Sequence, residues 1–160
     1  MPNRILIVED DTPIRELVTS LLRDVGYDVV TTTNGVAALE TLQRDQSFDL
    51  VLLDMGLPLM NGRELAQQMA ASGIDVPVLV MTAGRDARRA AHDIGAIGYI
   101  AKPFDIDELE RAVRVALEGG GEVNPRSHFA LPQLRSLRRS RLTGDATAPQ
   151  PFRLRRSFNV

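Results

Sequence analysis

Short apolar runs, separated by stretches of helical periodicity, constrain the fold of this chain more than any other feature. The runs occupy residues 5–8, 29–30, 50–53, 78–81 and 97–101. Each is bounded by polar or turn residues, as buried strands are. Between the first two runs, apolar residues form one helical stripe of Ile14, Leu17, Val18, Leu21, Leu22 and Val25. A strand followed by a helix, repeated five times, predicts a doubly wound α/β fold, in which helices cover both faces of a parallel sheet.

Local signals predict where some of these elements begin and where the strands lie in the sheet. Thr12 followed by Pro13 predicts an N-cap and a proline at the first helical position. Asp105 with Glu108 three residues later has the pattern of a capping box. Residues 27–32 are the least apolar strand and suit an edge of the sheet, whereas the first, third and fourth runs suit its centre.

Charge divides the chain into two parts. Residues 1–121 hold 11 basic and 19 acidic residues, whereas residues 122–160 hold 8 basic and 2 acidic residues. Three glycines at 119–121 predict a flexible linker between them. We therefore expect a folded acidic domain over residues 1–118 and a basic tail over 122–160. The tail is too short to hold a core without cysteine or a metal motif, so we expect it to be disordered.

The sequence also predicts a compartment. The chain has no cysteine, which excludes a disulfide scaffold and a thiolate metal site and suits a reducing environment. Its first apolar run is too short for a signal peptide, and no stretch approaches the roughly 20 apolar residues of a membrane span. We expect a soluble, cytoplasmic protein that does not contact a membrane.

The expected strand ends carry most of the reactive side chains. In a doubly wound sheet, ligands bind outside the carboxyl ends of the strands. The residues at these ends are Glu9, Asp10 and Asp11 after the first strand, Asp54 after the third, Thr82 after the fourth and Lys102 after the fifth. Lys102 is the single lysine among the 19 Lys and Arg residues. A compact ammonium group suits one phosphoryl oxygen, whereas the arginine fork prefers bidentate partners.

This set of side chains predicts a metal-assisted phosphoacceptor. Carboxylates about 4 Å apart repel by several kcal/mol, so a proton or a cation must offset their charge. Oxygen ligands without cysteine or clustered histidine favour Mg²⁺, which completes its shell with water and phosphate oxygens. Thr82 and Lys102 would supply a hydroxyl and a cation for that phosphate. One of the carboxylates is then the nucleophile that forms an aspartyl phosphate.

Four ordered motifs resemble one known family. They lie at residues 5–11 (ILIVEDD), 52–62 (LLDMGLPLMNG), 82–83 (TA) and 99–104 (YIAKPF). Over residues 4–118 the chain resembles the receiver domain of two-component response regulators. The resemblance implies a flavodoxin-like sheet with strand order 2-1-3-4-5. It also implies a phosphoprotein of a phosphorelay, which takes its phosphoryl group on Asp54 from a sensor histidine kinase or a phosphotransfer protein.

The resemblance assigns a role to each metal-site residue. Asp10 and Asp54 would ligate Mg²⁺ directly, and Glu9 would act largely through water. The backbone carbonyl of Gly56 would be a further ligand. At Gly56 the chain departs from the family, which usually carries there a side chain that tunes dephosphorylation.

The resemblance also implies a switch. Thr82 and Lys102 would contact the phosphoryl oxygens, and the peptide bond between Lys102 and Pro103 would be cis. Tyr99 would turn inward when Thr82 moves toward the phosphate, which would alter the face formed by the fourth helix, fifth strand and fifth helix. That face would control an unidentified downstream protein, either in a monomer or in a phosphorylation-dependent dimer. The interval from Thr82 to Lys102 is short, so we expect a short fourth helix around residues 85–93.

Two other classes of function remain open at this stage. A DNA-binding transcriptional regulator could act through the basic tail, where phosphate contacts would give salt-dependent and sequence-independent binding. A hydrolase of the haloacid-dehalogenase type would use an aspartate nucleophile, but that family places a second aspartate where this chain has Gly56. The leading expectation is therefore a stand-alone, single-domain receiver that acts through protein partners. We expect its only chemistry to be its own phosphorylation and autodephosphorylation, and we do not expect an enzyme that acts on other substrates.

Overall fold

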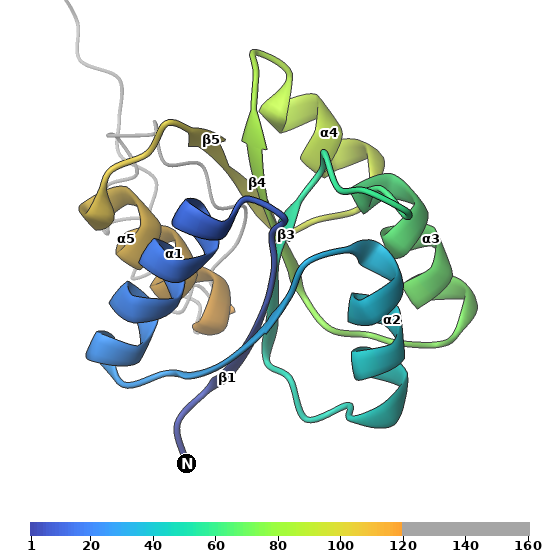
Figure 1. Ribbon diagram of the computed structural model, residues 1–160, viewed down its shortest axis with the longest axis horizontal. Helices are drawn as coiled ribbons and strands as arrows, with labels where there is room; N and C mark the ends of the chain where they lie inside the picture. Colours follow the sequence, from blue (N-terminus) through green and yellow to red (C-terminus); the bar gives the residue numbers. More distant parts are fainter. Residues whose placement is uncertain (120–160) are drawn as a thin grey trace, which may run out of the picture. The chain divides into compact units, whose positions relative to one another are not determined.

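The computed structural model describes residues 1–119, which form a parallel sheet with helices on both faces (Figure 1). The strands are β1 (Arg4–Val8), β2 (Asp28–Thr32), β3 (Leu50–Asp54), β4 (Val78–Ala83) and β5 (Gly98–Lys102). The helices are α1 (Thr12–Val25), α2 (Gly35–Arg44), α3 (Gly62–Ala71), α4 (Ala87–Asp93) and α5 (Ile106–Leu117). The predicted alternation of strands and helices is confirmed. The predicted tail at 122–160, and all of the predicted linker except Gly119, lie outside the described residues.

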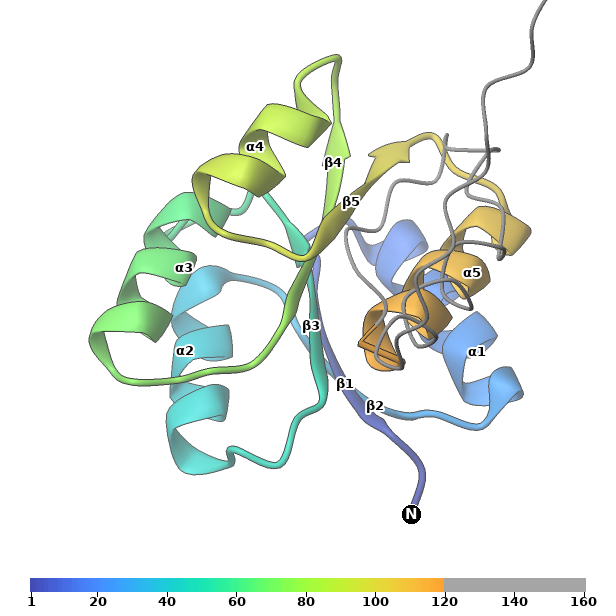
Figure 2. The same ribbon diagram turned by 180° about the vertical axis from the view of Figure 1, so that it is seen from behind.

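The strands lie in the order β2-β1-β3-β4-β5, and every neighbouring pair is parallel. This confirms the predicted order, with the least apolar strand at an edge. Helices α1 and α5 cover one face, while α2, α3 and α4 cover the other (Figures 1 and 2). The chain runs outward from β1 to β2 and then returns to β3 on the other side of β1. The carboxyl ends of β1 and β3 therefore flank the point where the strand order reverses, which is where such sheets bind ligands.

Two apolar cores result from the alternation of side chains along the strands. Ile5 and Ile7 of β1 pack with Val18 and Leu22 of α1 and with Leu109 of α5. On the opposite face, another cluster joins the intervening strand residues to α2 and α3; its members include Leu6, Val8, Ala38, Leu42, Leu65 and Met69. Because both faces of the sheet are covered, the central strands read as continuous apolar runs.

The start of α1 corrects one prediction. Asp11, and not Thr12, is the N-cap, and its carboxylate accepts a hydrogen bond of 2.9 Å from the backbone N–H of Ile14. The Thr12 hydroxyl instead accepts a hydrogen bond of 3.1 Å from Arg15. Thr12 is therefore already in the helix, and the cap falls on the preceding residue, whose backbone is extended.

Other local predictions have mixed outcomes. The capping box of Asp105 and Glu108 is confirmed at the start of α5. The short fourth helix is confirmed too, since α4 has seven residues. The apolar stripe of α1 is only partly buried, because Leu17 and Val25 are about half exposed. A stripe defined by spacing alone is wider than the helix face that meets the sheet. Within residues 1–119, none of the helices has the length and apolar character needed to cross a membrane.

Candidate functional site

The carboxyl ends of β1, β3, β4 and β5 are contiguous in the sheet, and they bring the expected reactive residues to one rim. Glu9 and Asp10 follow β1, Asp54 ends β3 and Lys102 ends β5. Glu9, Asp10 and Asp54 each offer a carboxylate oxygen, and these three oxygens lie within 4.8 Å of one another. Residues 45 positions apart along the chain are thereby placed around one small volume.

Glu9 is the most deeply buried member of this cluster. Its side chain is inaccessible to solvent, and one carboxylate oxygen accepts a hydrogen bond of 2.7 Å from Lys102 Nζ. The other accepts a bond of 3.1 Å from the backbone N–H of Asp11. Loss of solvent raises the pKa of Glu9 above its ordinary value, and the negative charge of Asp54 adds to this, while Lys102 and the Asp11 N–H oppose it. The ion pair with Lys102 therefore helps to hold a negative charge where burial disfavours one.

Asp54 is also buried, with 7% of its surface exposed. Its Oδ2 atom lies 3.6 Å from Lys102 Nζ, and its Oδ1 atom accepts a hydrogen bond of 3.3 Å from the backbone N–H of Gly56. The loop after Asp54 packs closely on the start of α3, because a Cβ on Gly62 would lie 2.9 Å from the Cα of Met55. A glycine at position 62 therefore permits the close approach that shapes the loop carrying Gly56.

Asp10 is exposed, and the loop that carries it is fastened by a residue that the sequence analysis missed. Arg15, in the first turn of α1, donates hydrogen bonds to the backbone carbonyls of Glu9 at 3.0 Å and Asp10 at 3.3 Å. An arginine one helical turn after an acidic pair is a weak signal in a sequence. Its function in this fold is positional, since it holds the β1–α1 loop without occupying the carboxylates.

Thr82 and Tyr99 lie on the neighbouring strands β4 and β5, whose carboxyl ends contribute to this rim. The Thr82 hydroxyl donates a hydrogen bond of 3.3 Å to the Ala83 carbonyl. Thr82 pairs with Ala101, and Val80 pairs with Tyr99, in the β4–β5 ladder. These four residues lie on one face of that ladder, because alternate residues of a strand point the same way. Tyr99 is half-buried. The Lys102–Pro103 peptide bond is cis, as the resemblance implied.

The donor set fits a hard divalent cation. Three carboxylates supply only oxygen ligands, and their mutual repulsion favours a cation among them. Lys102 offsets part of the negative charge of Glu9 and Asp54. Asp10 is the member of the cluster that remains exposed to solvent. Gly56, two residues after Asp54, is exposed and has no side chain that could cover the approach to Asp54. Magnesium, with its preference for carboxylates, water and phosphate oxygens, suits this arrangement.

Comparison with known proteins defines the class of this fold and site. The family model described as the response regulator receiver domain matches residues 5–114. Response regulator MprA of Mycobacterium sp. (strain KMS) is 40% identical over 120 residues, which are 73% of this chain and 51% of that protein. The chain thus spans about half the length of the MprA proteins that it matches. Sporulation initiation phosphotransferase F of Bacillus subtilis is 38% identical over 116 residues, which are 71% of this chain and 93% of that protein.

Comparison with solved structures also finds receiver domains. The receiver domain of the sensor histidine kinase PA1611 from Pseudomonas aeruginosa, solved with a magnesium ion in its active-site cleft, is 29% identical with a TM-score of 0.67. That match covers 74% of this chain and 99% of the other. A CheY-like receiver domain protein from Methanospirillum hungatei gives 27% identity and a TM-score of 0.67, over 74% of this chain and 96% of the other. The chain belongs to the response regulator receiver domain family, and its receiver domain is of the kind that serves two-component phosphorelays.

Proposed function

We propose that Asp54 accepts a phosphoryl group from a phosphohistidine on a sensor histidine kinase or a phosphotransfer protein. The observation that carries the proposal is the cluster of Glu9, Asp10 and Asp54 oxygens within 4.8 Å, with Lys102 Nζ 3.6 Å from Asp54. A nucleophilic carboxylate, a site for a cation and a fixed ammonium group are the parts that acyl phosphate formation needs. The proposed setting is the cytoplasm, where a phosphohistidine made from ATP is available.

In the proposed reaction, a carboxylate oxygen of Asp54 forms a bond to phosphorus as the phosphorus–nitrogen bond of the donor breaks. The departing imidazole nitrogen takes a proton from solvent. Asp10, Asp54 and the Gly56 carbonyl would hold Mg²⁺, with Glu9 acting through water, and the ion would neutralise charge on the phosphoryl oxygens. Lys102 and the Thr82 hydroxyl contact those oxygens and orient the group. Hydrolysis of the aspartyl phosphate by water resets the site, so the only proposed chemistry is on the chain itself.

The proposed output is a change in the face formed by α4, β5 and α5. Phosphorylation adds nearly two negative charges and new hydrogen-bond acceptors beside Thr82. Thr82 and Tyr99 share one face of the β4–β5 ladder, so a movement of Thr82 toward the phosphate opens space that Tyr99 can enter. A two-state element biased in this way changes which partner the face binds. The downstream partner is a protein in this proposal.

The test is the intact mass of the full chain after incubation with Mg²⁺ and a small phosphodonor such as acetyl phosphate. We expect one phosphoryl adduct in the wild type and none in Asp54→Asn. Asp49→Asn, which changes an exposed aspartate at the opposite end of β3, is the matched control and retains the adduct. An adduct of equal yield in Asp54→Asn would overturn the assignment of the acceptor.

A further inference from the structure

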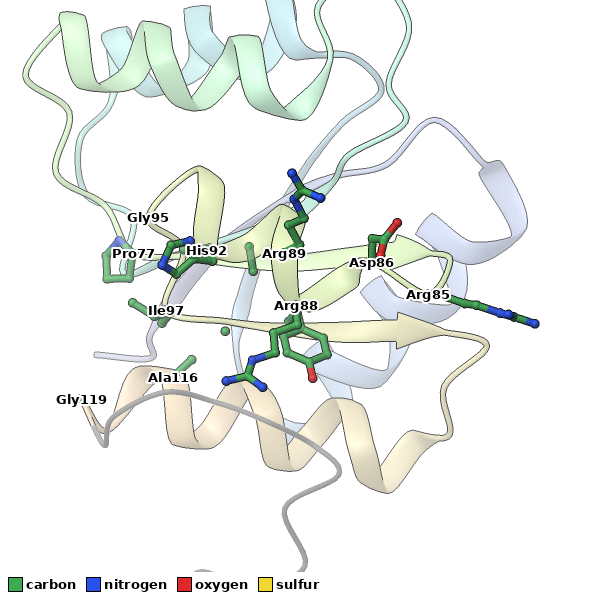
Figure 3. A pocket seen from close by; sticks show the side chains of 14 residues that line it. Pro77, Arg85, Asp86, Arg88, Arg89, His92, Gly95, Ile97, Ala116 and Gly119 are labelled. Carbon is green, nitrogen blue, oxygen red and sulfur yellow. The ribbon is translucent and has the colours of Figure 1, made fainter.

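A cavity of about 1050 Å³ lies on the α4–β5–α5 side of the domain (Figure 3), and its described lining does not include Glu9, Asp10 or Asp54. Its floor is apolar: Ala91 of α4, Gly98 of β5 and Ala116 of α5 are buried there, and Ile97 is half-buried. The charged residues that line it, which belong to α4 and the β4–α4 loop, are exposed, and Tyr99 of β5 is half-buried. The cavity is therefore an open groove with an apolar floor and a charged rim.

The rim of the groove is positively charged, whereas the domain as a whole is acidic. Residues 1–119 hold 19 acidic and 11 basic side chains, but those of them that line the groove include Arg85, Arg88 and Arg89 and one carboxylate, Asp86. Figure 3 shows the Arg88 side chain reaching across β5 toward α5, whereas Arg89 points to the opposite side of α4. Arg88 is thus the cation placed over the groove, and Arg85 extends outward beside it.

These cations are not neutralised from within the described part of the chain. Neither Arg85 nor Arg88 has an ion pair with another residue of 1–119. The carboxylate at the end of α4, Asp93, is already paired with Arg63 of α3 at 3.0 Å. Positive charge on the groove is therefore available to a partner.

The distribution of polar groups favours a protein segment over a small molecule. Small-molecule sites usually place a few polar groups among apolar walls to orient the ligand, but Ala91, Gly98 and Ala116 at this floor carry no polar side chain. An apolar centre with charges at its margin is the usual anatomy of a protein interface. Complementarity then requires negative charge on the segment that binds.

We propose that this groove docks an acidic segment of a partner protein. Carboxylates of the segment face Arg88 and Arg85, and an apolar side chain covers Ala91, Gly98 and Ala116. This inference rests on the proposed function, since it gives the chemistry of the partner for the α4–β5–α5 face. The chain's own residues 122–160 have 8 basic and 2 acidic side chains, so their charge opposes binding at this rim.

The experiment titrates the full 160-residue chain into a labelled peptide in which leucines at helical spacing alternate with glutamates. The same peptide with glutamine for glutamate is its control. Fluorescence anisotropy measures affinity for the wild type, Arg88→Glu and Arg44→Glu. Arg44 is a matched control, because it is an exposed arginine at the end of α2, remote in the sequence from every lining residue. Shifts of the backbone amide signals of Gly98 and Ala116 in NMR spectra locate the bound peptide.

We expect saturable binding of the glutamate peptide that Arg88→Glu weakens about fivefold to tenfold and Arg44→Glu changes less than about twofold. Binding should weaken with added salt, and the Gly98 and Ala116 signals should shift. The proposal is overturned by no binding, by equal binding of the glutamine peptide, or by equal affinities of Arg88→Glu and Arg44→Glu, as contact with the basic residues 122–160 would give. Self-association that Arg88→Glu abolishes, without peptide binding, would identify a second copy of the chain as the occupant and also overturn it.

Phosphorylation is measured separately on the same samples by intact mass. If the adduct on Asp54 fails to form while the peptide binds at the groove, the proposed function fails and the acidic-segment inference stands. If the adduct forms normally in the wild type and in Arg88→Glu but the peptide does not bind, the groove inference fails by itself.

Discussion

Each end of the sheet gathers carboxylates around one cation, but the two ends differ in how many of these carboxylates the cation contacts. At the amino end of β1, Arg4 lies with its Nε atom 3.0 Å from Asp28 and also pairs with Asp45. Its guanidinium lies 4.7 Å from the centre of the Phe48 ring, and its backbone N–H donates a bond of 2.7 Å to Asp49. This rim ties β1, β2 and the α2–β3 loop together.

At the carboxyl end, Lys102 Nζ lies 2.7 Å from Glu9 and 3.6 Å from Asp54, and Asp10 is the third carboxylate of the cluster. The lysine is a point charge that cannot satisfy three carboxylates at once, whereas an arginine fork reaches several partners. Arg4 thus contacts all three of its carboxylates and forms a closed structural clamp, whereas Lys102 contacts two of its three and leaves Asp10 open. A cluster of acids indicates a binding site where the local cation does not reach every carboxylate.

The largest effect that should separate the rims is stabilisation by Mg²⁺. At a Mg²⁺ concentration 100 times its Kd, binding to the native state alone adds about 2.7 kcal/mol to the free energy of unfolding. Urea denaturation with and without Mg²⁺ measures it. Asp10→Asn should lose most of this gain and Asp45→Asn should keep it. An equal Mg²⁺ response in both variants would contradict the assignment of the open rim.

Removing the contacts of Arg4 should change the free energy of unfolding by less than Mg²⁺ binding does. Arg4→Ala removes the contact with the Phe48 ring and two partly exposed ion pairs, so we expect a loss of about 1–2 kcal/mol in the free energy of unfolding. Arg4→Lys is the matched variant, and it should fall between the wild type and Arg4→Ala, because lysine keeps the charge without the fork. Full stability in Arg4→Lys would show that the several contacts of the fork add nothing.

In the absence of divalent cations, replacing an aspartate with asparagine should change the stability of the fold in opposite directions at the two rims. Asp10→Asn reduces repulsion among carboxylates and should stabilise the fold by about 0.5–1 kcal/mol, after allowance for the exposure of Asp10. Asp28→Asn removes a partner of Arg4 and should destabilise slightly. Urea denaturation in a chelating buffer compares them. Changes of the same sign would mean that the two clusters are electrostatically alike.

The smallest effect should appear only in acid. Hydrogen bonds from the Ser47 hydroxyl and N–H, with help from Arg4, lower the pKa of Asp45 from 3.8 to about 2. A carboxyl whose pKa is lower in the folded state adds stability that is complete above its unfolded value, near pH 4, and is lost as pH falls toward 2. The difference in denaturation midpoint between the wild type and Asp45→Asn should therefore be constant above pH 4 and shrink below it. A difference that persists unchanged at pH 2 would contradict this cause.

The sequence predicts much of the open rim and little of the clamp. Glu9, Asp10, Asp54, Thr82 and Lys102 follow from one rule, because each stands at the expected carboxyl end of a strand. The partners of Arg4 cannot be found in this way. They lie on β2 and on the α2–β3 loop, and no local pattern shows that these segments meet at β1. Their meeting depends on the final placement of the loops.

The sequence by itself determined the alternation of strands and helices, the buried central strands and the end of the sheet that carries the acids, because these follow from periodicity and from residues near one another in the chain. Only the tertiary structure decided that Asp11 caps α1, that Arg15 fastens the β1–α1 loop and that Lys102 lies closer to Glu9 than to Asp54. Such choices depend on small differences in distance between neighbouring groups, such as 2.7 Å from Lys102 to Glu9 against 3.6 Å to Asp54. They are set when the elements pack, and the spacing of residues along the chain does not contain them.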